Sequence, residues 1–223
     1  MTWLALTMLG GIVALDASSF GQLMLSRPLV AGALAGWIVG MPLEGALIGA
    51  MLEALSLSIL PVGAAKYPET GTAAIAAVGT LGFSGVTPTP ASLLLILVYG
   101  LLWQRAAGST VIGGRYINER LVRAGRSSTT RMDRLIQLRH LESMVLDVMR
   151  GTIITMVALL LGVPLVRFAV THWQAPSPLA SLVIAISASA VLAGTAPLFV
   201  DAQRGRLYLV AGLLWGSILL VLQ

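Results

Sequence analysis

Glu53 is the residue whose type and position most clearly indicate binding chemistry. It lies in residues 43–60, an apolar stretch whose only other charged residue is Glu44. A charge at the centre of a bilayer costs about 2.5 to 3.5 kcal/mol even on the milder scale, so something must stabilise the carboxylate there. A charged carboxylate accepts hydrogen bonds from hydroxyl groups, and each such bond contributes roughly 1.5 to 3 kcal/mol. Glu53 is therefore a candidate ligand for a polar, hydroxyl-bearing substrate.

Outside this stretch, the charged residues nearest to Glu53 along the chain are Arg27, Lys66 and Glu69. An intramembrane carboxylate with such neighbours is by default a binding-site hypothesis. The alternative is a structural ion pair between Glu53 and either Arg27 or Lys66. Both interpretations remain open at the level of sequence.

Residues 61–72 contain two prolines, two glycines and a Lys/Glu pair in an apolar neighbourhood. This composition predicts a non-helical loop. At membrane depth, the loop would offer backbone donors and acceptors to a polar ligand. At the surface, it would be an ordinary connector.

The composition of the whole chain indicates an all-α, polytopic integral membrane protein. Of its 223 residues, 57% are hydrophobic and 10% are charged, and the mean hydropathy is +0.91. A soluble domain carries about 25% charged residues, so that class is excluded. The chain has no cysteine and therefore no thiol nucleophile and no disulfide. We also predict no metal ligand and no cofactor, because no His/Cys cluster and no phosphate-binding glycine loop is present.

Three apolar stretches in the second half predict transmembrane helices, at residues 151–171, 179–200 and 207–222. The first of them has 21 residues, or roughly 31 Å as a helix, which matches a hydrocarbon core about 30 Å thick. The first half instead divides into short apolar pieces. Short pieces predict broken or re-entrant helices, which are tolerated where they are buried in protein or line a watery cavity.

The positive charge is concentrated between these two halves. Residues 105–150 hold nine arginines and four acidic residues, which accounts for the whole net charge of +5. Positive residues next to membrane segments are retained on the inner side, so we predict a cytoplasmic segment and no nucleic-acid partner. Apolar residues recur in it at helical spacing, which predicts an amphipathic helix. These apolar residues are Met132, Leu135, Leu138, Leu141, Val145 and Val148. The predicted division is a membrane-embedded region with the site (1–104), the basic segment (105–150) and C-terminal transmembrane helices (151–223).

Two further patterns have a structural and a functional interpretation. Glycines recur every four or five residues at Gly32, Gly36, Gly40, Gly45 and Gly49, which favours close helix packing. Residues 82–85, Gly-Phe-Ser-Gly, have the form of the serine motif in rhomboid-type proteases. The only histidines are in the basic segment and beside a tryptophan, so neither is convincingly placed as a base. We predict no catalytic residue, and the protease remains a remote alternative.

Several motifs between Asp16 and Ala77 resemble those of a known family of membrane permeases. The motifs are Leu15-Asp16, Gln22, Ser26-Arg27-Pro28-Leu29-Val30-Ala31, Gly49-Ala50-Met51-Leu52-Glu53-Ala54-Leu55, Pro61-Val62-Gly63-Ala64-Ala65 and Pro68-Glu69. On these motifs the chain resembles enzyme IIC, the permease subunit of the mannose/fructose/sorbose branch of the bacterial phosphotransferase system. A weaker similarity at residues 139–151 extends the resemblance over most of the chain.

The resemblance implies a multi-pass, sugar-translocating subunit of the bacterial inner membrane that is not itself an enzyme. It implies a hexose-type substrate, a second membrane subunit called IID, and a phosphohistidine-carrying IIB protein that phosphorylates the sugar. We also expect an oligomer. By motif position, Gln22, Glu53 and Glu69 would face the sugar, and with Arg27 and Lys66 they form the predicted substrate-binding cluster.

Several positions depart from what is usual in the family, among them Ser26, Met41 and Lys66. They motivate a second hypothesis, a membrane scaffold or regulator that kept the fold and lost transport.

Overall fold

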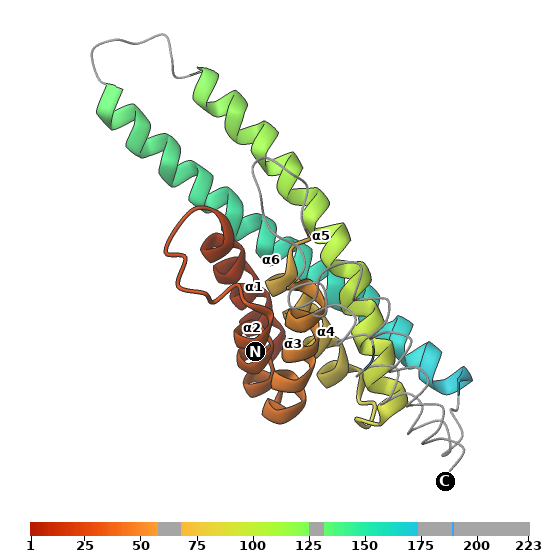
Figure 1. The fold of residues 1–223 in the computed structure, drawn as a ribbon. Helices are drawn as coiled ribbons and strands as arrows, with labels where there is room; N and C mark the ends of the chain where they lie inside the picture. Colours follow the sequence, from red (N-terminus) through yellow and green to blue (C-terminus); the bar gives the residue numbers. More distant parts are fainter. Residues whose placement is uncertain (58–67, 125–131, 174–188, 190–223) are drawn as a thin grey trace, which may run out of the picture.

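The computed structural model describes residues 1–57, 68–124, 132–173 and Ser189 (Figure 1). Lys66, most of the predicted loop, and the two predicted transmembrane stretches at 179–200 and 207–222 lie outside the described residues. All regular elements in the described part are helices, in the order α1 (Thr2–Ser18), α2 (Pro28–Val39), α3 (Pro42–Ser56), α4 (Thr70–Ser84), α5 (Pro90–Ala124) and α6 (Met132–His172).

The helices fall into four short and two long ones. Helices α1 to α4 have 17, 12, 15 and 15 residues, or roughly 18 to 26 Å each, which is less than a hydrocarbon core of about 30 Å. Helices α5 and α6 have 35 and 41 residues and are apolar enough to cross a membrane over Pro90–Arg120 and Gln137–His172. The all-α integral membrane fold is thus confirmed, with the predicted short pieces in the first half.

The basic segment continues both long helices. Helix α5 runs through the predicted boundary after residue 104, and α6 runs through the one after residue 150. The two helices lie side by side and project as an arm beyond α1 to α4 (Figure 1). In this arm the amide of Asn118 donates to the hydroxyl of Ser143 at 2.8 Å. Of the predicted apolar stripe, Leu138, Leu141 and Val145 are exposed on α6.

Local sequence signals explain where the short helices begin and end. Pro28 and Pro42 occupy the first helical positions of α2 and α3, where the missing N–H of proline has no cost. Gly40 and Gly85 end α2 and α4 in the left-handed conformation, with φ of 77° and 67°. Gly40 therefore ends a helix, and nothing lies within 4 Å of the position its Cβ would take. Its predicted place in the packing stripe is wrong.

The other four glycines of that stripe form the contact between α2 and α3. A Cβ on Gly32 would lie 2.6 Å from the carbonyl oxygen of Gly45, and one on Gly36 would lie 2.9 Å from the Gly45 Cα. A Cβ on Gly49 would clash with the carbonyl oxygen of Pro28. Real Cβ atoms do not approach so closely, so glycine is what permits this hairpin of two short helices. The packing interpretation of the glycine repeat is confirmed.

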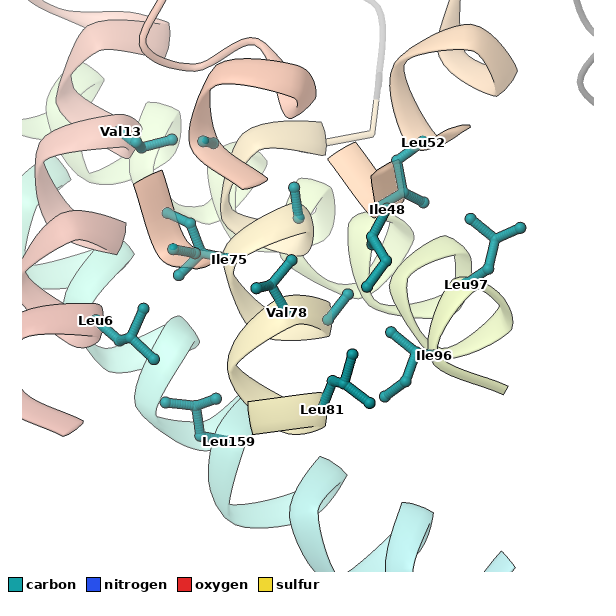
Figure 2. Close-up of a cluster of buried hydrophobic side chains, with 14 of the residues drawn as sticks. Leu6, Val13, Ile48, Leu52, Ile75, Val78, Leu81, Ile96, Leu97 and Leu159 are labelled. Carbon is teal, nitrogen blue, oxygen red and sulfur yellow. The ribbon is translucent and has the colours of Figure 1, made fainter. Parts of the chain in front are cut away.

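Helix α4 is the centre of the bundle, with 12 of its 15 residues buried. Its side chains Ile75, Val78 and Leu81 lie between Leu6 and Leu159 on one side and Ile48 and Ile96 on the other (Figure 2). The neighbours come from α1, α6, α3 and α5. Surrounding a short helix with protein is how the ends of a broken helix are kept from lipid.

Candidate functional site

Polar side chains gather where the short helices end and begin. We call this region the polar end: the C-terminal ends of α1 and α3 and the N-terminal ends of α2 and α4. Gln104 of α5 connects two of them, because its carbonyl accepts the backbone N–H of Glu69 at 3.0 Å and its side-chain oxygen accepts the Ser56 hydroxyl at 3.4 Å. The carboxylates predicted from sequence, Glu53 and Glu69, both lie in this region.

Glu53 forms an ion pair with Arg27 across the α2–α3 contact. Arg27 Nη1 lies 3.3 Å from Glu53 Oε1, and the backbone N–H of Leu29 donates to Glu53 Oε2 at 3.0 Å. The sequence left Arg27 and Lys66 open as partners of Glu53. The structure shows the pair with Arg27, and Lys66 lies outside the described residues. The Glu53 side chain is 19% exposed and that of Arg27 is 51% exposed. A carboxylate has about four acceptor positions, so the described residues leave roughly two on Glu53 for other donors.

Glu69 forms a second ion pair at the polar end, with Arg150. It precedes α4, and Arg150 of α6 donates to both of its oxygens at 2.6 and 3.1 Å. The same guanidinium donates to the hydroxyl of Thr110 in α5 at 3.2 Å. Glu69 is buried and Arg150 is nearly so, with side chains 6% and 12% exposed, respectively. This bidentate pair joins α4, α5 and α6 at the polar end.

Asp147 extends the buried pair toward α1. Its Oδ1 lies 3.7 Å from Arg150 Nε, and its Oδ2 accepts the Ser18 hydroxyl at 2.8 Å and also the hydroxyl of Ser19. The sequence prediction missed Arg150 and Asp147, because both were counted in the basic segment. The available signal was an acid and a base three residues apart, just before the apolar stretch from residue 151.

Asp16 organises the connection between α1 and α2, where two predicted site residues lie. It is 4% exposed, and its carboxylate accepts the backbone N–H groups of Leu23 at 2.5 Å and Ser26 at 2.9 Å. Gln22 is exposed in this connection and has φ of 48°. Arg27 is the last residue of the connection, directly before α2. The structure therefore brings Arg27 and Glu53 together, and gives Glu69 a separate partner.

The serine motif at residues 82–85 is the C-terminal end of α4. The Ser84 hydroxyl donates to the Leu81 carbonyl at 2.8 Å. Arg167 of α6 donates to the carbonyls of Ser84 and Phe83, both at 2.8 Å. A histidine in contact with this serine is what a protease would need; His140 is instead exposed on the arm, and His172 contacts the Phe168 carbonyl. The motif acts here as a helix end.

Two comparisons with known proteins bear on this arrangement. Residues 1–199 match the model of a protein family described as the sorbose-specific IIC component of the phosphotransferase system. A solved structure described as "Structure of membrane protein" covers 99% of this chain and 94% of its own, with a TM-score of 0.69 and 19% identity. At that identity the likeness shows the fold alone. No curated protein matches the chain.

The family match covers most of the chain and includes every helix of the polar end. It confirms the resemblance that the motifs between Asp16 and Ala77 carry. With its all-helical membrane fold, the chain belongs to the sorbose-specific IIC family, the sugar permease components of the phosphotransferase system.

Proposed function

We propose that this chain carries a hexose-type sugar across the bacterial inner membrane, and that the sugar binds at the polar end with Glu53 as its principal acceptor. The observation that supports the proposal is how few partners the Glu53 carboxylate has among the described residues, together with its partial exposure. In the part of the chain that the structure describes, one arginine and one backbone N–H hold it, and it is still partly exposed. A sugar presents several hydroxyl donors, which suit the acceptor positions that Glu53 has left.

The other predicted ligands differ in how easily a sugar could reach them. Gln22 and Arg27 are exposed around the connection that ends beside Glu53 and would contribute an amide and a guanidinium. Glu69 lies under Arg150, so it would reach a sugar only when that pair rearranges. Lys66 belongs to the segment between α3 and α4 and completes the proposed ligand set.

We further propose that the chain works with a IID membrane subunit and is served by a IIB protein that carries the phosphoryl group. The chain has no cysteine to carry a phosphoryl group, and its basic segment obeys the rule for cytoplasmic segments. The arm formed by α5 and α6 is the part of the described structure that extends farthest from the short helices (Figure 1). It would therefore lie on the side where IIB acts, with α5 and α6 crossing the membrane.

Uptake of radiolabelled mannose, fructose and sorbose tests the proposal in cells that make this chain with IID and IIB components. We expect Glu53→Gln to reduce uptake by about tenfold or more, since a neutral amide loses the charge-assisted acceptor. Glu44→Gln is the matched control, because Glu44 lies in the first turn of the same helix, away from the polar end. Equal uptake by wild type and Glu53→Gln would contradict the proposed role of Glu53. Absence of both uptake and sugar binding in wild type would favour the scaffold hypothesis.

A further inference from the structure

We infer that Asp16 is a positioning residue for sugar binding: its buried carboxylate holds the connection between α1 and α2 so that Arg27 and Leu29 meet Glu53. This inference rests on the proposed function of Glu53. Asp16 lies in the last turn of α1 and does not need to touch the sugar. It acts through the backbone of the residues that follow.

The connection between α1 and α2 has an unusual backbone conformation. Gln22 and Met24 have φ of 48° and 63°, the left-handed region that side chains other than glycine rarely occupy. A strained backbone persists only where its surroundings hold it. The two hydrogen bonds from Leu23 and Ser26 to Asp16 are what hold it here, because they fix the residues on either side of Met24.

Hydrogen bonds and the ion pair link this connection to Glu53. The backbone N–H of Arg27 donates to the Met24 carbonyl at 3.1 Å, so the position of Arg27 follows that of Met24. Arg27 and Leu29 in turn contact Glu53, through the Arg27 guanidinium and the Leu29 backbone N–H. A chain of direct contacts therefore runs from Asp16 to the proposed sugar acceptor.

The connection also contacts the first turn of α4. A Cβ on Gly71, in the first turn of α4, would lie 2.5 Å from the Ser26 carbonyl oxygen and 2.7 Å from the Val13 side chain. The connection is thus seated directly on the start of α4, two residues after Glu69. Asp16 and Gly71 fix it from two sides, and a change at either one should displace Arg27 in the same way.

The test measures the KM and maximal rate of uptake for whichever of mannose, fructose and sorbose the wild type transports best. We expect Asp16→Asn and Gly71→Ala each to raise KM about tenfold, with a maximal rate per molecule within about twofold of wild type. Gly113→Ala on α5 is the control, because nothing lies within 4 Å of the added Cβ. A lowered amount of folded protein with unchanged KM in both variants would indicate a structural role and overturn the inference.

Met24→Gly supplies an independent readout. Glycine adopts the left-handed conformation without strain, so the connection should need Asp16 less. We expect the double variant Asp16→Asn/Met24→Gly to recover most of the loss in KM, and Met24→Gly alone to leave KM near the wild-type value. If Asp16→Asn does not fold, Gly71→Ala alone decides, and a wild-type KM in that variant overturns the inference. Failure of the proposed function itself would differ, since the wild type would then show no saturable uptake.

Discussion

The two ion pairs at the polar end differ mainly in exposure. Arg27 and Glu53 join two neighbouring short helices at 3.3 Å, and the arginine is half exposed. The pair of Arg150 and Glu69 is bidentate and almost fully buried, and Arg150 also donates to the hydroxyl of Thr110. The first pair is open to solvent or to a ligand, whereas the second is enclosed by the helices it joins.

The difference in exposure implies a difference in role. An exposed ion pair contributes little to stability, typically 0 to 1 kcal/mol, and its groups exchange partners easily. Breaking a buried pair leaves an uncompensated charge and costs about 3 to 5 kcal/mol. Mutations at the two pairs should therefore separate sugar binding from stability.

The largest effect is expected for Arg150→Met, which leaves the Glu69 carboxylate buried without its partner. We predict a loss of about 3 to 5 kcal/mol in the free energy of unfolding. Denaturant unfolding of the purified protein in detergent measures it. The double variant Glu69→Leu/Arg150→Leu should recover most of the loss, because both charges are then removed. A single variant as stable as wild type would contradict the assignment of this pair as the structural one.

Asp147→Asn tests whether the buried network reaches α1 as the contacts indicate. We predict a loss of about 1 to 3 kcal/mol in the same unfolding measurement, since hydrogen bonds to a charged group are replaced by weaker ones. Glu142→Gln is the control on the same helix, because Glu142 pairs with Arg139 on an exposed surface. It should change stability by less than about 1 kcal/mol. Equal effects of the two variants would remove Asp147 from the network.

Much of the fold follows from local patterns in the sequence. Pro28 and Pro42 begin helices where proline is tolerated, and Gly32, Gly36, Gly45 and Gly49 recur on one face of each helix. Such features act over a few residues and can be recognised without neighbours in space. The spacing of Gly40 in the sequence does not show whether the residue packs against another helix or ends its own. Its φ of 77° in the structure shows that it ends α2.

The site was harder to predict because its partners are far apart in the chain. Arg27 and Glu53 are 26 residues apart, within one pair of neighbouring helices, and their pairing was one of the two alternatives considered. Arg150 is 81 residues from Glu69, and only the fold brings them together. In the sequence, Arg150 is one of the arginines that predict a cytoplasmic segment. A charge count assigns a side of the membrane but not an individual partner.

The smallest stability effect is expected at the exposed pair. Arg27→Gln should change the free energy of unfolding by less than about 1 kcal/mol, and the difference from wild type should shrink at high salt, because exposed charges are screened. Unfolding at low and high salt concentration measures it. The effect of Arg150→Met should persist in the same series, since buried pairs are screened much less. Equal salt sensitivity of both variants would contradict the contrast between the pairs.

Titration calorimetry of sugar binding to the purified chain, with the midpoint of unfolding measured on the same variants, decides whether Glu53 accepts the sugar. For Glu53→Gln, we predict a sugar affinity at least about tenfold weaker than in wild type, with a nearly unchanged midpoint of unfolding. Glu44→Gln should match wild type in both. If Glu53→Gln binds the sugar as tightly as wild type, Glu53 is not the sugar's acceptor.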